Sequence, residues 1–254
     1  MTGLSPPLSE LLLDHPIFRE SIRRIRLLLA EQAAGDGGLA GQLAALTPLE
    51  RDVLERCIHS SGDPAIAGDL RCSPAGGGGA CDRGAAALAA GALILTDTAM
   101  AAAAVAPMAR RTFGNRVACV LDWAPAAAPE GSTRAAAGMA AALAELVPGT
   151  ATLPRQPAVV LIGSAPTALE LLLEQVAAGG PAPALVIGMP VGFVGVAESK
   201  RHLAASGLAH IGLEGSKGGA GLVAAACNAL LRAAWLQAAS APSVLSSGSA
   251  AASP

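Results

Sequence analysis

Residues 183–200 read PALVIGMPVGFVGVAESK, and this stretch decides the fold. Residues 184–189 form an unbroken apolar run, and a turn rich in glycine and proline separates it from a helical segment that begins at residue 195. A strand without alternating polar residues is typical of a parallel sheet that is covered on both faces. The stretch therefore predicts a buried strand, a tight loop and a helix.

The same pattern recurs on both sides of this stretch. The predicted strands are residues 92–97, 116–122, 158–164, 184–189 and 210–214, and the predicted helices are 99–111, 133–147, 165–178, 195–205 and 219–237. Strands that alternate with helices in this way predict an α/β fold. We expect three layers, with a mostly parallel five-stranded sheet between helices on both faces.

The N-terminal third of the chain shows no such alternation. Residues 14–32 carry apolar side chains at helical spacing, and a second helix begins at Pro48, where Thr47 and Glu50 form a capping-box pattern. We predict two N-terminal helices joined by a loop over residues 35–41. A turn region over residues 73–84 then precedes an alanine-rich helix.

The boundaries of the predicted domain follow from composition. We expect one α/β domain over residues 14–237, a flexible N-terminal segment over 1–13 and a disordered tail, rich in serine and alanine, over 238–254.

Composition excludes several classes of protein. The 254 residues include 17 basic and 19 acidic side chains, for a net charge of −2, and 52% are hydrophobic. The chain is too apolar for a disordered protein and lacks the basic excess of a nucleic-acid binder. No apolar run reaches the roughly 18 residues of a membrane span, and no signal peptide is visible, so we expect a cytoplasmic protein.

The five cysteines show no C-x-x-C pair. We expect them to be small buried side chains in a reducing compartment, without a disulfide framework or a structural zinc, and we predict no metal site.

Ligands of an open parallel sheet bind beyond the carboxyl ends of its strands. Thr96, Asp97 and Ser164 stand there, together with glycine-rich segments at 188–195 and 215–221 whose backbone amides favour anions. Residues 219–224 match a relaxed G-x-G-x-x-A pattern, but the acidic residue that follows in dinucleotide-binding folds is missing. Dinucleotide binding is therefore a minor alternative, and no P-loop is present.

The second helix carries the more informative signal. Arg56 continues the apolar stripe begun by Leu49 and Val53, and an arginine on a buried face needs an anionic partner or a pocket. His59 projects from the same part of the helix and exchanges protons near neutral pH. By itself His59 is better explained as a core or helix-end histidine, but beside Arg56 an acid/base role is equally supported.

The other histidines and one charged segment carry weaker signals. No pair among His15, His202 and His210 has metal-ligand spacing, so we expect structural or solvated side chains. Residues 198–200, which end in Lys200, are explained equally well as ligand contacts and as a solvated helix start.

Taken together, these motifs resemble one family, the precorrin-8X methylmutases, which are also called precorrin isomerases or cobalt-precorrin-8 methylmutases. The resemblance runs from about Ser21 to Leu231 and is most specific over residues 188–200. The segments that carry it are 21–26, 56–59 with 62–63, 91–97 with Met100, 133–136, 165–169, 183–200, 218–219 and 224–230.

The resemblance implies an isomerase of corrin biosynthesis that needs no cofactor. Such an enzyme moves a methyl group from carbon 11 to carbon 12 of ring C by a formal [1,5] shift, giving hydrogenobyrinate or its cobalt form. It further implies that His59 donates or accepts the proton and that Ser21 and Arg56 bind the tetrapyrrole. Thr96, Asp97, Arg134, Ser164, Thr167 and Lys200 are further expected substrate contacts, from strand-end position and motif match. The implied fold is flavodoxin-like and homodimeric, with the site near the subunit interface.

The chain departs from the family pattern at Ser132, Ala135 and Ser164, and in the loop over residues 123–131. These departures touch expected substrate loops. They motivate an alternative from another functional class, a non-catalytic protein that binds a tetrapyrrole on the same fold.

Overall fold

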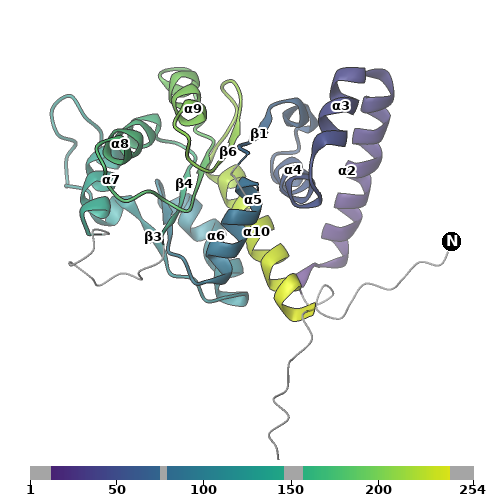
Figure 1. The fold of residues 1–254 in the computed structure, drawn as a ribbon, viewed down its shortest axis with the longest axis horizontal. Helices are drawn as coiled ribbons and strands as arrows, with labels where there is room; N and C mark the ends of the chain where they lie inside the picture. Colours follow the sequence, from purple (N-terminus) through teal and green to yellow (C-terminus); the bar gives the residue numbers. More distant parts are fainter. Residues whose placement is uncertain (1–12, 75–78, 146–156, 241–254) are drawn as a thin grey trace, which may run out of the picture.

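The computed structural model describes residues 13–74, 79–145 and 157–240, and within them a six-stranded sheet forms the centre of the molecule (Figure 1). The strands are β1 (Leu70–Cys72), β2 (Ile94–Thr96), β3 (Val117–Cys119), β4 (Val159–Ile162), β5 (Leu185–Gly188) and β6 (His210–Leu213). Their order is β1-β6-β5-β4-β2-β3. Neighbouring strands from β6 to β3 pair in parallel, whereas β1 pairs antiparallel with β6.

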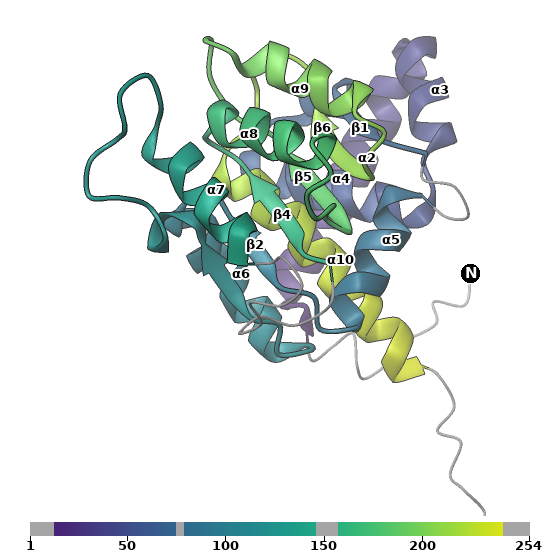
Figure 2. The ribbon, with the colours of Figure 1, turned by 60° about the vertical axis from the view of Figure 1, so that its left-hand side comes forward.

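Helices cover both faces of this sheet, as Figure 2 shows. One face carries α7 (Arg134–Glu145), α8 (Pro166–Ala177) and α9 (Val196–Ala205). The other carries α5 (Ala80–Ala89), α6 (Ala99–Arg111) and α10 (Ala220–Ser240). The predicted α/β class and three-layer arrangement are thus confirmed in their coarse form.

The central strands are apolar on both sides because each side meets a different core. Val159, Leu161 and Ile187 pack in the core beneath α5, α6 and α10, while Val160 and Val186 pack in the core beneath α7, α8 and α9. Successive residues of a strand point to opposite faces, so an unbroken apolar run fills both cores. This is the physical reason that the apolar runs identified the strands.

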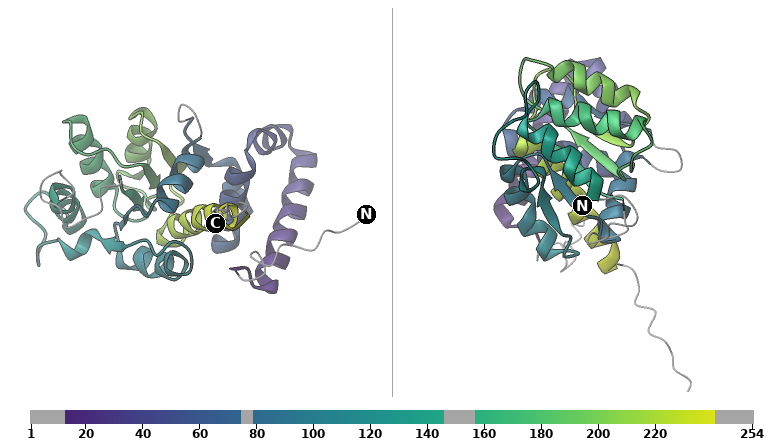
Figure 3. Two further views of the ribbon diagram at one scale, coloured as in Figure 1. Left: turned by 60° about the horizontal axis from the view of Figure 1, so that its bottom comes forward. Right: turned by 90° about the vertical axis from the view of Figure 1, so that its left-hand side faces the viewer.

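The N-terminal helices form a further layer on the α10 side. They are α2 (Pro16–Gly35), α3 (Gly37–Ala45) and α4 (Pro48–Ser61). α4 packs against α10, and α2 packs against α4, so α10 lies between the sheet and the N-terminal helices (Figure 3). The predicted capping box is present: Glu50 N–H donates to Thr47 Oγ1, and Thr47 N–H donates to Glu50 Oε2 at 2.8 Å.

Several expectations about local structure are wrong. The sheet of the described residues has six strands, whereas five were predicted, and the additional strand is β1. The predicted loop at 35–41 is mostly helical, since Asp36 caps α3 by accepting from the N–H groups of Gly38 and Leu39. The predicted strand 116–122 ends at Cys119, where a 3₁₀ turn, η2 (Val120–Asp122), replaces its last residues.

Two helix starts and ends also differ from the prediction. α5 begins at Ala80, within the predicted turn region 73–84. α10 extends to Ser240, so residues 238–240 of the predicted tail are helical. Residues 1–12 of the predicted N-terminal segment, residues 146–147 of the helix predicted over 133–147, and the rest of the tail lie outside the described residues.

Two glycines allow loops to pack closely at the carboxyl edge of the sheet. A side chain at Gly218 would overlap the carbonyl oxygen of Met189, and a Cβ at Gly163 would lie 2.7 Å from the backbone nitrogen of Ala220. The chain therefore needs glycine at these two positions for its own packing.

α10 is the one helix among the described residues that is long and apolar enough to cross a membrane by length and composition. It packs against α4, α5 and α6, and its buried side chains belong to the larger core cluster. Its apolar character is that of a central core helix.

Candidate active site

A cleft of about 450 Å³ opens where α2, α4, α6 and α10 meet. Its lining residues are Phe18, Arg56, His59, Ser60, Ala104, Gly221, Ala224, Ala225 and Asn228. Arg56 and His59, which the sequence paired on one helix, therefore face the same cavity. The first turns of α10 contribute small residues, which leave room for a ligand beside the two polar side chains.

His59 lies in the last turn of α4, one turn after Arg56, and is exposed to solvent. Its Nδ1 is 2.7 Å from the hydroxyl oxygen of Ser21 on α2. The ring of Phe18 meets the His59 ring edge to face, with 4.8 Å between centroids and an interplanar angle of 78°. These two contacts fix the orientation of the imidazole and leave Nε2 as the ring nitrogen available to a ligand.

Arg56 is buried and belongs to a network of charges. Its Nη2 is 3.3 Å from Asp14 Oδ1, and its Nε is 3.5 Å from Asp52 Oδ2. Arg232 on α10 also binds Asp14, by donation from Nε to Oδ2 at 2.7 Å. Two arginines and two aspartates thus balance one another, which is how a buried guanidinium is tolerated.

The network leaves Arg56 incompletely satisfied. Its Nε has no hydrogen-bond partner among the described residues, although the atom is buried. The guanidinium carbon lies 4.3 Å from the centroid of the Phe18 ring, so Arg56, Phe18 and His59 form one stack. We expected Arg56 to need an anionic partner or a pocket, and it has both: it pairs with Asp14 and Asp52, and it lines the cleft.

Asn228 is a lining residue that the sequence did not single out, although it lies in one of the segments carrying the family resemblance. Its Nδ2 donates to the carbonyl of Ala104 at 3.3 Å, whereas its buried Oδ1 has no partner among the described residues. An unpaired amide oxygen beside the cleft is a candidate for a ligand contact.

Thr96, Asp97 and Ser164 lie at the carboxyl ends of β2 and β4, as predicted, but the contacts of the first two are internal. Thr96 is fully buried and donates to backbone carbonyls of Thr98 and Ala118. Asp97 is also fully buried, and its Oδ2 accepts from the N–H groups of Gly163, Ser164 and Ala165. Burial raises the pKa of Asp97 despite these three bonds.

The remaining expected contacts lie away from the His59 cleft. Arg134 is exposed and donates to the carbonyl of Pro125. The Thr167 hydroxyl is 2.7 Å from that of Thr133, and Thr167 lines a second cleft of about 420 Å³ with Glu170, Glu174 and Glu198. Lys200 donates to the carbonyls of Gly215 and Lys217. The carboxylates of the second cleft repel anions, so it suits an anionic ligand less than the His59 cleft.

The other three histidines have structural or surface contacts, as predicted. His15 caps α2 by accepting from the N–H of Ile17. His202 Nδ1 lies 2.8 Å from Glu170, and His210 Nδ1 lies 2.9 Å from the carbonyl of Leu208. None of the three lines the His59 cleft.

Comparison with known proteins identifies relatives over nearly the whole domain. Residues 16–233 match the precorrin-8X methylmutase family. A precorrin-8X methylmutase of Pseudomonas aeruginosa is 43% identical over 219 residues, which cover 84% of this chain and 93% of that protein. A cobalt-precorrin-8 methylmutase of Synechocystis sp. is 35% identical over 88% of this chain and 97% of that protein.

A solved structure supports the same relationship. The crystal structure of a precorrin-8X methylmutase from Thermus thermophilus is 35% identical and superposes with a TM-score of 0.64, covering 81% of this chain and 97% of that chain. The chain belongs to the precorrin-8X methylmutase family, whose members are isomerases of cobalamin biosynthesis.

Proposed function

We propose that this enzyme catalyses the methyl shift from carbon 11 to carbon 12 of precorrin-8X or of cobalt-precorrin-8, with His59 as its acid/base. The observation that carries the proposal is the Ser21–His59 pair, 2.7 Å apart, beside a cleft that also contains Arg56. An acid/base group held at a fixed orientation beside a cationic binding group is what an acid-catalysed rearrangement of a polycarboxylate requires.

The proposed reaction begins with a proton from His59. Protonation of the conjugated macrocycle leaves it electron-poor, which lowers the barrier to migration of the methyl group between adjacent carbons. His59 then takes a proton back, so the reaction is an isomerisation without net gain or loss of atoms. No cofactor is needed in this scheme.

Ser21 has a specific part in this cycle. A hydroxyl can donate to Nδ1 of the neutral ring or accept from N–H of the charged ring. The same contact can therefore persist in both protonation states, while Nε2 gains and loses the proton at the substrate. We propose Ser21 as a positioning residue that also fixes which nitrogen reacts.

Substrate binding is proposed to rest on Arg56, on the unpaired oxygen of Asn228 and on the open backbone around Gly221. The substrate's carboxylates match the Arg56 guanidinium that lines the cleft, and its face matches the small side chains of α10. Six expected substrate contacts do not line the His59 cleft, so each would have to act from outside it or across a subunit boundary. They remain predictions: Thr96, Asp97, Arg134, Ser164, Thr167 and Lys200.

We further propose a flavodoxin-like sheet, a homodimer and a cytoplasmic location. The five parallel strands have the order β3-β2-β4-β5-β6, which corresponds to the 2-1-3-4-5 order of that fold, with β1 added at one edge. Exposed apolar side chains at the carboxyl edge of the sheet support a second subunit. The packing of α10 within the core supports a protein that does not span a membrane.

The test is an absorbance assay in which purified protein is mixed with metal-free precorrin-8X and, separately, with its cobalt form. We expect the wild type to produce the spectrum of hydrogenobyrinate or cobyrinate, and His59→Ala to bind the substrate without converting it. The form that the wild type converts faster, metal-free or cobalt-containing, identifies its substrate.

Binding without product by both proteins would overturn the proposed reaction and favour the non-catalytic tetrapyrrole-binding protein. Equal turnover by the wild type and by His59→Ala would instead retain the reaction and remove His59 from it.

A further inference from the structure

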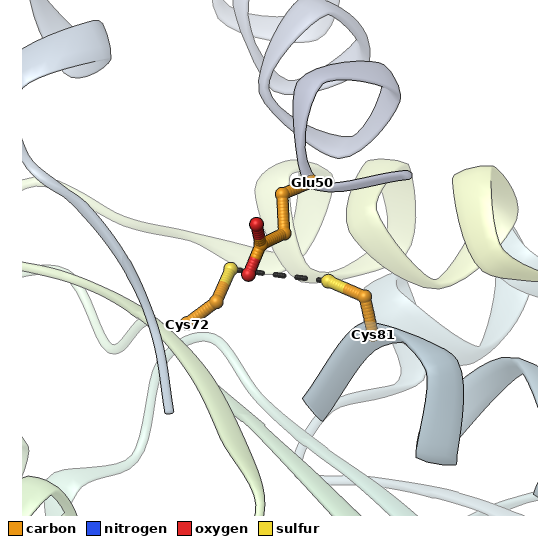
Figure 4. A group of neighbouring side chains, drawn as sticks. All are labelled: Glu50, Cys72 and Cys81. Atoms are coloured by element: carbon orange, nitrogen blue, oxygen red, sulfur yellow. Dashed lines mark hydrogen bonds between the residues drawn. The ribbon is translucent and has the colours of Figure 1, made fainter. Parts of the chain in front are cut away.

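We propose that Cys72, Cys81 and Glu50 form a binding site for a thiophilic divalent cation such as Zn²⁺, separate from the His59 cleft. The three side chains come from three different elements: the end of β1, the first turn of α5 and the first turn of α4 (Figure 4). The sequence contains no C-x-x-C pattern that would indicate such a site. The two thiols come together because the antiparallel edge strand β1 lies beside α5.

The spacing of the ligand atoms supports metal coordination. The two sulfur atoms are 3.8 Å apart, and both lie within 4.8 Å of a carboxylate oxygen of Glu50. In a tetrahedral centre with Zn–S bonds of about 2.3 Å, two sulfurs stand about 3.8 Å apart. The thiols therefore already have the separation that a shared zinc ion needs, with a carboxylate oxygen within 4.8 Å of each.

The same spacing argues against a disulfide as the purpose of the pair. A disulfide needs the sulfurs about 2.05 Å apart, closer than the 3.8 Å that separates them here.

Water would complete a tetrahedral coordination by these three side chains, and Asp82, the exposed neighbour of Cys81, lies beside the cluster. A Cβ built at Gly79 would lie 3.8 Å from Asp82 Oδ2 and 3.9 Å from Glu50 Oε1, so both carboxylates flank the same glycine. Three protein ligands with water in the fourth position is a common zinc coordination.

The electrostatics of the cluster favour a cation. The contact with Cys72, burial and the nearby Glu50 and Asp82 carboxylates all raise the pKa of the Cys81 thiol. The same carboxylates disfavour a negative thiolate but attract a divalent cation. The thiols become ligands of that cation by releasing their protons.

The position of the site indicates a structural role. Glu50 is nine residues from His59 along α4, which corresponds to about 13.5 Å at the rise of an α-helix. The cation would fasten the start of α4 to β1 and α5, and so stabilise the helix that carries Arg56 and His59 without entering their chemistry.

The test uses the full-length protein, reduced and stripped of metal under anaerobic conditions, and titrated with Co²⁺ as a spectroscopic probe. We expect one equivalent to produce the near-ultraviolet thiolate-to-cobalt absorption and the strong visible bands of tetrahedral Co²⁺, and Zn²⁺ to remove both. Zn²⁺ should also raise the Tm.

Three variants and a matched control locate the site. Cys72→Ser and Cys81→Ser should lose the thiolate absorption and the Zn²⁺-dependent rise in Tm, while Cys119→Ser, whose thiol lies elsewhere, should retain both. Glu50→Gln keeps the capping box, since glutamine also serves at that position, and should weaken Co²⁺ binding at least tenfold. Far-ultraviolet circular dichroism checks that each variant is folded.

Two results would overturn the proposal. One is the absence of thiolate absorption when the reduced wild type is titrated with Co²⁺. The other is absorption that persists in both folded cysteine variants, which would place the cation elsewhere.

Discussion

The hydroxyl of Ser21 is the contact on which the orientation of the His59 imidazole depends, because Phe18 restrains the ring only through its edge. We expect Ser21→Ala to lower kcat by roughly tenfold with little change in KM, since a misaligned base loses part of the acid/base contribution. The pH profile of kcat should also shift.

Ser61→Ala is the matched control for this measurement. Ser61 stands near the end of the same helix, but its hydroxyl donates to the carbonyl of Cys57 and does not reach His59. An equal loss of kcat in both serine variants would show that the end of α4 is simply perturbed, and would contradict the positioning role of Ser21.

The pKa of the Lys200 ammonium group tests how far this side chain is withdrawn from solvent. Desolvation lowers its pKa from 10.5 to about 8, while its ammonium group donates to two backbone carbonyls. Above about pH 8 the folded protein has released this proton, whereas the unfolded chain holds it until about pH 10.4. Between these values the unfolded state binds more protons, so the contribution of Lys200 to the free energy of unfolding rises with pH.

The measurement is an NMR titration of ¹³C-methylated lysines. The chain has two lysines, and the ion pair with Asp63 raises the pKa of the other, Lys217. We expect one resonance to titrate near pH 8 and to disappear in Lys200→Met. Titration of both lysines above pH 10 would contradict the desolvation of the half-buried Lys200 side chain.

At the scale of elements, two glycines in helices should respond to alanine in opposite directions. In α7, a Cβ at Gly138 would overlap the carbonyl oxygen of Val120 in η2, a backbone atom that cannot turn away. In α3, a Cβ at Gly41 would meet nothing within 4 Å. We expect Gly138→Ala to destabilise the protein by about 1–3 kcal/mol, and Gly41→Ala to stabilise it by about 0.5–1 kcal/mol.

Equilibrium unfolding in urea measures both effects. Because the two substitutions are chemically identical, the difference between them isolates the close approach of α7 to η2. Equal effects at the two positions would mean that α7 can move away from η2 without loss of packing.

The elements that the sequence predicted are those whose pattern comes from burial on both faces. The strand at residues 185–188 and its neighbour β4 are apolar throughout, and their neighbour β6 is apolar after His210. The helices between these strands follow from the same pattern. β1 was missed because it is three residues long, contains the exposed Arg71 and joins the sheet by antiparallel pairing with a distant strand. α3 was not predicted because it contains three glycines, which have low helix propensity, and the cap provided by Asp36 compensates for them.

The same distinction applies to the site. Arg56 and His59 could be paired from sequence because helical spacing alone places them on one side of α4. Asp14, Phe18 and Arg232 could not be added to this pair from sequence. Asp14 and Phe18 reach Arg56, and Arg232 reaches Asp14, only after α2 and α10 pack against α4. The role of Ser21 came from the family resemblance, and the structure supplies its contact with His59.

At the scale of the whole molecule, exposed apolar side chains gather at the carboxyl edge of the sheet. Phe193 is 95% exposed and Val194 87% exposed in the loop after β5, and Met100 is 68% exposed at the start of α6, directly after β2. β2 and β5 are parallel strands of one sheet, so both segments leave its same edge. Single exposed apolar residues are common, but several at one edge indicate a surface that is covered in the assembled protein.

We therefore expect this edge to form the homodimer contact, and Phe193→Glu to shift the protein toward the monomer because it would bury a charge without a partner. Light scattering coupled to size-exclusion chromatography should give twice the chain mass of 24.8 kDa for the wild type and a lower mass for the variant. Leu27→Glu, which changes an exposed leucine on α2, should keep the wild-type mass. Dissociation by Leu27→Glu alone would place the contact on the N-terminal helices instead, and the edge of the sheet would then need another partner.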